Sequence, residues 1–478
     1  MSHAGFLLAA PASGSGKTTI TCGLLAALKK RNIAVRSFKS GPDYIDPMYH
    51  EKVIGVPSWN MDTFFSDERE ICDLYEREQE KYEYSVIEGA MGLYDGLGGT
   101  RPEGSAYHLA QTLDLPVFVI LDARGMGRTM VALLAGLLRY DCDHRIAGVI
   151  LNRTTERFYR IIKPQIEAEP GLSVLGFFPE QKNLHLESRH LGLKLPEEIE
   201  KLRERVCEAA ETLEKTVDVD KLLHLAGERA GEKRERKTAG QKLVEESTKS
   251  VEIIENAEKI HGCIREAEKK VRIAVATDPA FCFYYKENLR LLEKRGAELV
   301  EFSPLEDPVL PEGVEGLLLG GGYPELFAGR LSSNVSMRRS IREAIEAGMP
   351  SVAECGGFMY LHESITDGDG VVHPMVGAVP GGCRNTGRLV RFGYVELKEK
   401  EQRFLGGKPI RGHEFHYYNS DDNGHDCGAE KPVTRRSWEC VHEGKTHWWG
   451  YPHLYYPSNP YFVEYFLQEC KTFRESRK

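Results

Sequence analysis

A glycine-rich segment near the start of the chain carries residues suited to phosphate chemistry. Residues 10–19 read APASGSGKTT and lie between an apolar run and a helical pattern. The glycines allow backbone N–H groups to turn toward phosphate, Lys17 can reach the terminal phosphates, and the Thr18 hydroxyl can hold Mg²⁺. We therefore predict an ATP site, against the alternative of a Gly/Ser-rich turn, although Pro11 occupies the place of the usual first glycine. The nucleotide residues that we predict in this loop are Gly14, Ser15, Gly16, Lys17, Thr18 and Thr19.

Acidic residues follow two further predicted strands. In FKSGPDYIDP (38–47), Lys39 could neutralise a transferring phosphoryl group, while Asp43 and Asp46 could bind Mg²⁺ or orient a substrate. A solvated Gly-Pro-Asp turn is the alternative interpretation. In IEGAMGLYDG (87–96), Glu88 ends an apolar strand, where a metal-binding acid belongs, and Asp95 lies on the same loop.

A third predicted strand ends in a residue with an amide side chain. Asn152 closes the run GVILN and could hydrogen-bond the nucleotide base, although asparagine is also a common first residue of turns.

A cysteine in the second half of the chain has the local sequence of a nucleophile. Residues 351–360 read SVAECGGFMY, which predicts a strand, a sharp turn at Cys355 and a helix. A thiol at a helix N-terminus has a lowered pKa, and small neighbours leave room for a substrate. A buried structural cysteine is the alternative.

Two other segments could complete the chemistry of this thiol. The glycines of LGGGYPE (319–325) could supply N–H groups to an oxyanion, or form a plain loop. His453 could serve as the general base, with His413 and His416 as rivals.

Alternating strands and helices must position these groups. The first part predicts the strands 6–10, 34–38, 84–88, 117–122 and 146–152 and a helix over 18–30. The second part predicts the strands 271–277, 299–302, 316–319 and 351–353 and helices over 286–295 and 337–347. This rhythm is typical of parallel α/β sheets.

A charge-dense stretch with few large apolar residues separates the two parts. We predict an ATP-binding domain over residues 1–227, a linker with some helix over 228–270, and a second α/β domain over 271–478.

Composition narrows the class of protein. The 478 residues include 63 basic and 72 acidic side chains, so we expect no nucleic-acid partner. No apolar run approaches the roughly 20 residues of a membrane span, and no signal pattern starts the chain. We therefore expect a cytoplasmic protein whose 11 cysteines stay reduced.

Taken together, these motifs resemble the cobyrinate a,c-diamide synthase family. The resemblance rests on the order of the motifs given above together with RHLGL (189–193), GHEFHY (412–417) and HLYYPSNP (453–460). It implies a P-loop NTPase-like parallel-sheet domain, similar to dethiobiotin synthetase, followed by a class I glutamine amidotransferase domain. The implied reaction amidates two acetate side chains of a corrinoid in cobalamin biosynthesis, each with one ATP and one glutamine.

The resemblance also implies roles for single residues. Thr18, Asp46 and Glu88 would hold Mg²⁺, while Asp43, Tyr44 and Asp95 would orient or activate the substrate carboxylate. Cys355 would form a glutamyl thioester and His453 would move the proton. Because ammonia is mostly protonated at neutral pH, we expect sheltered delivery between the two sites, and a homodimer is left open.

The sequence leaves open two other substrates and one other class of protein. Ni-sirohydrochlorin and hydrogenobyrinate would undergo the same reaction, and an ATP-driven switch or partitioning protein could share the phosphate loop but would not need Cys355. The sequence also departs from the family pattern: Tyr455 stands where many such glutaminases carry a glutamate two residues after the histidine. The charged insert is longer than we expect for the family.

Overall fold

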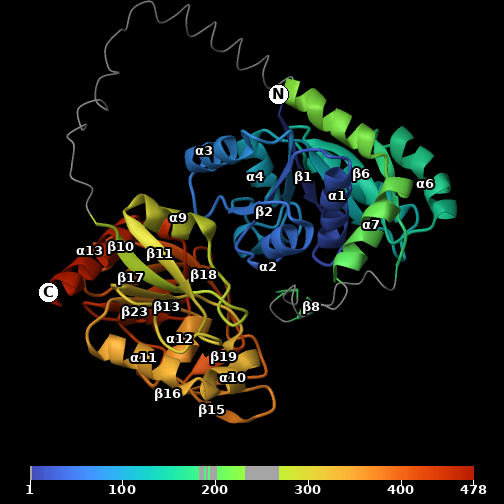
Figure 1. Ribbon diagram of the computed structural model, residues 1–478. Helices are drawn as coiled ribbons and strands as arrows, with labels where there is room; N and C mark the ends of the chain where they lie inside the picture. Colours follow the sequence, from blue (N-terminus) through green and yellow to red (C-terminus); the bar gives the residue numbers. More distant parts are fainter. Residues whose placement is uncertain (1–2, 182–187, 190–191, 194–201, 232–268, 478) are drawn as a thin grey trace, which may run out of the picture.

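Two α/β domains lie side by side in the computed structural model, the first blue to green and the second yellow to red (Figure 1). The structure describes residues 3–181, 188–189, 192–193, 202–231 and 269–477. Most of the predicted linker 228–270 falls outside these ranges, and its first residues, up to 231, continue a helix that starts at 219.

A parallel sheet of seven strands forms the first domain. Its order is β3 (Ser58–Met61), β2 (Val35–Ser40), β4 (Tyr84–Glu88), β1 (Ala4–Ala9), β5 (Val117–Asp122), β6 (Ile146–Asn152) and β7 (Val174–Phe178). Strand β1 is buried along its whole length, as expected for a strand covered on both faces. All of these strand ends point the same way, so the segments that follow β1, β2, β4 and β6 gather at one edge.

Helices cover both faces of this sheet (Figure 1). One core contains α1 (Lys17–Lys30) and α7 (Leu202–Thr216). The other contains α3 (Glu68–Gln79), α4 (Ala106–Leu113), α5 (Thr129–Tyr140) and α6 (Glu156–Ala168). Helix α1 ends on Lys29 and Lys30, whose charges suit the negative end of the helix dipole. No helix in the described ranges is both long and apolar enough to cross a membrane.

The second domain is built on a six-stranded sheet. Its order is β11 (Ala297–Phe302), β10 (Val271–Ala276), β12 (Gly316–Leu319), β13 (Ser351–Glu354), β23 (His447–Gly450) and β22 (His442–Glu443), with only the β22 pairing antiparallel. Helices α11 (Val335–Glu346) and α12 (Gly356–Leu361) pack on one face. Helices α9 (Lys286–Lys294) and α13 (Tyr461–Ser476) pack on the other.

Two further sheets extend this domain beyond the predicted elements, and all of their strand pairs are antiparallel except β14 with β16. One added sheet consists of β15 (Val372–Pro374), β14 (His362–Thr366), β16 (Val379–Asn385) and β19 (Tyr418–Ser420). The other consists of β21 (Ser437–Cys440), β20 (Cys427–Glu430), β17 (Arg391–Glu399), β18 (Ile410–His416) and β24 (His453–Leu454). The parallel strands and helices that the sequence predicts are confirmed within two residues at their ends, whereas no strand of the two added sheets was predicted.

The two domains meet through a segment of the first domain that follows β2 and β3. Arg411 donates a hydrogen bond to the Phe64 carbonyl at 2.7 Å, and Tyr394 donates one to Asp62 at 2.7 Å. Ion pairs add to the contact, because Arg290 reaches Glu78 at 2.7 Å. These contacts hold the segment after β3 and helix α3 against β17, β18 and α9 of the second domain.

Candidate functional site

The phosphate loop connects β1 to α1, as predicted. Gly16 has φ 89°, and a Cβ there would lie 2.2 Å from the Asn152 amide nitrogen, so only glycine fits. Asn152 donates to the Ser15 carbonyl at 2.7 Å and thus braces the loop from β6. A contact of Asn152 with the base stays a prediction.

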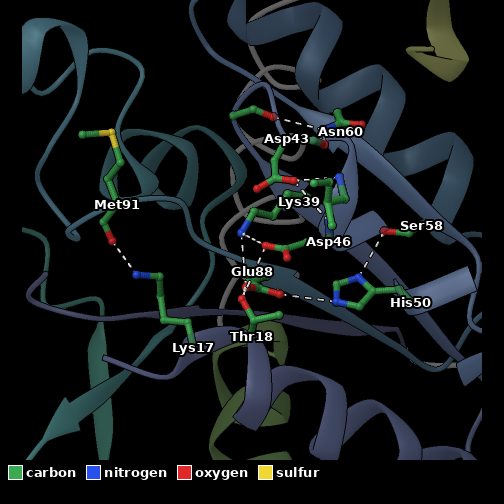
Figure 2. Close-up of polar contacts among 12 residues, drawn as sticks. Lys17, Thr18, Lys39, Asp43, Asp46, His50, Ser58, Asn60, Glu88 and Met91 are labelled. Carbon is green, nitrogen blue, oxygen red and sulfur yellow. Dashed lines mark hydrogen bonds and ion pairs between the residues drawn. The ribbon is translucent and has the colours of Figure 1, made fainter. Parts of the chain in front are cut away.

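Figure 2 shows Lys17 directed toward Met91 and Thr18 directed toward Glu88. Lys17 Nζ donates to the Met91 carbonyl at 2.6 Å, so its ammonium already lies beside the loop after β4. Thr18 donates to Glu88 at 2.7 Å and to Asp46 at 3.5 Å. The order of β1, β2 and β4 in the sheet is what brings these three segments together.

Lys39 links the two acids at the centre of Figure 2. Its Nζ lies 2.5 Å from Asp46 Oδ2 and 3.2 Å from Glu88 Oε1, and all three side chains are buried. Burial alone would raise the pKa of Glu88, but the charges of Lys39 and His50 and the Thr18 hydroxyl hold it below its usual value. Burial lowers the pKa of Lys17 to about 8, with the positive charge of Lys39 acting in the same direction. The charges of these side chains therefore affect one another's pKa values, and a bound anion would shift those pKa values.

His50 belongs to this cluster and was missed by the sequence reasoning. Its Nε2 lies 3.3 Å from Glu88 Oε2, and its Nδ1 lies 2.9 Å from Ser37 Oγ. His50 lies in η1 (Tyr49–Ile54), a helix turn just after α2 (Ile45–Met48). It follows the quoted FKSGPDYIDP motif by three residues, so only a longer reading of that motif could have found it.

Two more predicted acids lie on loops beside the cluster. Asp43 accepts hydrogen bonds from the backbone N–H groups of Ile45 and Asp46 at 2.8 and 3.1 Å. Asp95 accepts one from Gly92 N at 3.1 Å. These bonds fix the carboxylates on loops from β2 and β4, next to the predicted position of the terminal phosphate.

Hard oxygen donors gather where Mg²⁺ is expected. The hydroxyl of Thr18 and the carboxylates of Asp46 and Glu88 meet within hydrogen-bond distances, and Mg²⁺ prefers oxygen ligands. Within the described ranges no three His, Cys, Asp or Glu side chains are placed so that they alone could hold a metal ion. An open donor set of this kind fits a metal that is shared with nucleotide phosphates.

The predicted nucleophile lies at a strained turn. Cys355 lies between β13 and α12, has φ 47° and ψ −104°, and is buried. A positive φ is rare for a residue other than glycine and marks functional turns. Burial raises the pKa of its thiol in the resting site, so activation depends on a nearby base.

A glycine loop joins the region of this thiol to His453. A Cβ on Gly321 would come within 2.3 Å of the His453 ring, and one on Gly356 would come within 2.9 Å of Gly322 N. The segment 320–322 therefore lies against both His453 and the residue after Cys355, which is the place for an oxyanion loop.

Of the rival histidines, His416 has both ring nitrogens engaged, with the Tyr418 carbonyl at 2.7 Å and Glu414 at 2.9 Å. His413 stacks on His453 with ring centroids 4.9 Å apart and contacts the Tyr285 hydroxyl at 3.0 Å. His453, whose Nδ1 has no hydrogen-bond partner among the described residues, stays the predicted base.

The acid next to His453 precedes the nucleophile in the chain. Glu354 Oε2 lies 4.0 Å from His453 Nδ1, and Tyr456 donates to the other carboxyl oxygen at 3.0 Å. Burial raises the pKa of Glu354 to about 8 and lowers that of His453 to about 3. Sequence reasoning missed Glu354, although it is adjacent to Cys355.

Tyr455 explains the departure from the usual glutaminase pattern. Its ring stacks on Phe65 of the first domain at 5.0 Å, and its hydroxyl accepts a hydrogen bond from Ser66 at 3.2 Å. The side chain at this position therefore packs against the first domain at the domain interface.

Tyr44 connects the two candidate sites. It follows Asp43 in the first domain, yet its ring stacks on Phe283 at 5.0 Å and lies 5.2 Å from the His453 ring. Tyr285 also contacts it, at 4.6 Å. The two sites thus share a wall of aromatic side chains.

Family comparisons agree with this division into two kinds of site. A model described as the CobQ/CobB/MinD/ParA nucleotide binding domain matches residues 6–193. A model described as the CobB/CobQ-like glutamine amidotransferase domain matches residues 272–456. Fold and sites together define a glutamine amidotransferase fused to a nucleotide-binding domain.

Full-length relatives identify the family. The cobyrinate a,c-diamide synthase of Caldanaerobacter subterraneus is 39% identical over 473 residues, which cover 98% of each chain. Those of Listeria innocua and Picrophilus torridus are 38% and 36% identical, covering 95% and 97% of this chain and 96% and 98% of theirs. The chain belongs to the cobyrinate a,c-diamide synthase family.

Proposed function

We propose that this protein amidates the a and c acetate carboxylates of cobyrinate, using ATP and glutamine. The observation that carries the proposal is the full-length match to relatives of that name. The presence of both candidate sites in one chain supports it, because neither site alone could complete the reaction.

The first site would make the carboxylate reactive. A substrate carboxylate oxygen attacks the γ-phosphorus of ATP and ADP leaves, which gives an acyl phosphate. Lys17 and Lys39 would neutralise the phosphates, while Asp43 and Asp95 would orient the substrate. Thr18, Asp46 and Glu88 would hold Mg²⁺, which supplies positive charge to the phosphate oxygens when it is bound.

The second site would release ammonia. The sulfur of Cys355 attacks the glutamine amide carbon as His453 accepts the thiol proton, and His453 then returns a proton to the departing ammonia. The thioester is hydrolysed to glutamate. Glu354 would act as a positioning residue, because its carboxylate can stabilise the imidazolium form of His453.

Ammonia would then attack the acyl carbon and displace inorganic phosphate. The aromatic contacts of Tyr44 with His453 and Phe283 support sheltered passage between the sites. A cytoplasmic location, a homodimer and the domain division 1–227, 228–270 and 271–478 remain part of the proposal.

The test is an amidation assay followed by mass spectrometry, with cobyrinate, sirohydrochlorin and its nickel complex offered separately. We expect two mass changes of one amidation each on cobyrinate with Mg-ATP and glutamine. Cys355→Ala should abolish amidation from glutamine and retain it with added ammonium. Selective amidation of the nickel complex would move the assignment to that substrate, and unchanged glutamine use by Cys355→Ala would refute its role.

A further inference from the structure

A small cavity opens at the start of β17, and none of the catalytic residues described above lines it. Its volume is about 240 Å³. We call it the basic groove, and its lining includes Leu389, Arg391, Phe392, Lys431, Arg436 and Trp438. These residues come from the entry and first residues of β17, from the segment that joins β20 to β21, and from β21 itself.

Positive charge dominates the basic groove. Arg391, Lys431 and Arg436 are cationic, and its lining contains no acidic residue, although the whole chain has a formal charge of −9. Among the described residues none of the three forms an ion pair with a carboxylate. Burial lowers the pKa of Lys431 to about 8, against the opposing effect of the Glu414 charge. The groove is therefore suited to an anion.

Apolar and aromatic side chains lie beside these charges. The Arg391 guanidinium lies 4.8 Å from the Trp438 ring centre, and Lys431 Nζ lies 5.7 Å from it. Phe392 is 54% exposed and Leu389 is 39% exposed. A ligand that combines carboxylates with a flat apolar body would match both features.

The strand and the turn that line the basic groove also contact loops of the ATP domain. Val433, between Lys431 and Arg436, packs against Gly98, where an added Cβ would lie 3.3 Å from the valine Cβ. Gly98 lies three residues after Asp95. On β17, Tyr394 lies two residues beyond Phe392, and its hydroxyl would be 3.7 Å from a Cβ on Gly41, just before Asp43. The elements that line the groove therefore contact both loops that carry predicted substrate residues.

We propose that the basic groove binds one edge of a polycarboxylate tetrapyrrole while another edge presents its acetate to the ATP site. This inference rests on the proposed function. Arg391, Lys431 and Arg436 would bind carboxylates that do not react, and Trp438 and Phe392 would contact the ring. The volume of the groove is below that of typical ligand pockets, so it holds an edge and leaves the rest of the substrate over the domain boundary.

Arg436 and its neighbour Arg435 provide a matched test. Both are exposed arginines, but Arg435 pairs with Glu430 at 2.7 Å and does not line the groove. We expect Arg436→Gln and Arg391→Gln each to raise the KM and the Kd for cobyrinate about tenfold, since each removes one charge-assisted contact. Arg435→Gln should change neither by more than about twofold on the same scale. The KM for ATP and the thermal midpoint report whether a variant is folded.

The variant assays can give three results that count against the groove proposal. If wild-type protein amidates cobyrinate while Arg436→Gln and Arg391→Gln match Arg435→Gln in KM and Kd, the groove proposal is wrong and the proposed function stands. If the variants change the oligomeric state by light scattering and leave the KM intact, the groove is a subunit contact and the proposal is also wrong. If wild-type protein neither binds nor amidates any of the three tetrapyrroles, both proposals fail.

Discussion

At the residue scale, the environment of His453 depends on Glu354. The histidine is buried and its Nδ1 has no hydrogen-bond partner among the described residues, so the carboxyl group 4.0 Å away is the nearest acid for it. A gap of this length is too wide for a hydrogen bond. Such contacts often tighten only when substrate binds.

The pH dependence of glutamine hydrolysis should therefore follow Glu354. Its pKa is raised to about 8, so the carboxylate that stabilises protonated His453 becomes populated as the pH rises through that value. We expect kcat for glutamine hydrolysis to increase between pH 7 and pH 9. Glu354→Gln should lower kcat about tenfold or more and remove that increase, while Glu354→Asp restores part of it. A pH profile of Glu354→Gln parallel to that of wild type would contradict this role.

Several residues of the site could be predicted because they lie in short motifs at strand ends. Lys17, Cys355 and Glu88 have local signals of this kind. Glu354 and His50 have none, because a buried acid or histidine next to a strand has the same local sequence whether or not it faces a reactive group. Their positions depend on which strands become neighbours, and a single sequence does not specify that order.

At the element scale, most of the parallel strands could be predicted from apolar runs, but β3, β7 and β23 were not, and neither were the strands of the two added sheets. Strand β17 has an irregular mixture of buried and exposed residues, so it gives no clean alternation. It nevertheless carries Tyr394, which hydrogen-bonds Asp62 across the interface. Contacts of this type lie far apart in sequence and leave no periodic signal.

The interface should make stability depend on pH through Asp62. Burial raises its pKa to about 6, so the folded protein keeps a proton that the unfolded chain loses near pH 4. Raising the pH from about 4 to about 6 therefore costs stability, up to about 3 kcal/mol from this group. Asp62→Asn carries no such charge. We expect the free energy of unfolding of Asp62→Asn, measured in urea, to increase relative to that of wild type as the pH is raised from about 4 to about 6. A difference between the two proteins that does not change with pH would contradict this role of Asp62.

At the scale of the whole molecule, two chemistries share one aromatic wall. Tyr44 follows an acid of the ATP site, and its ring faces His453 of the second domain. Phe283, Tyr285 and Tyr323 extend the same cluster. A wall of this composition excludes water, which would protonate ammonia in transit.

Removing the Tyr44 ring should uncouple the two reactions. We expect Tyr44→Ala to hydrolyse more glutamine per amide formed than wild type, because ammonia escapes through the space that the ring vacates. The measurement compares glutamate with amide product over a time course. Tyr140→Ala is the control, since Tyr140 is 71% exposed. Equal ratios in Tyr44→Ala and wild type would show that the ring does not retain ammonia.

The interface also decides how the protein can be handled. Several aromatic side chains of the second domain are buried when both domains are present: Phe283, Tyr285 and Tyr455. Tyr44 packs on Phe283 and Phe65 packs on Tyr455, so the first domain contributes to this burial. If the two domains were expressed as separate chains, each would expose to solvent the aromatic side chains that the other domain now covers. Recombinant work on either half alone would therefore meet aggregation first, and coexpression of both pieces is the rational route to soluble material.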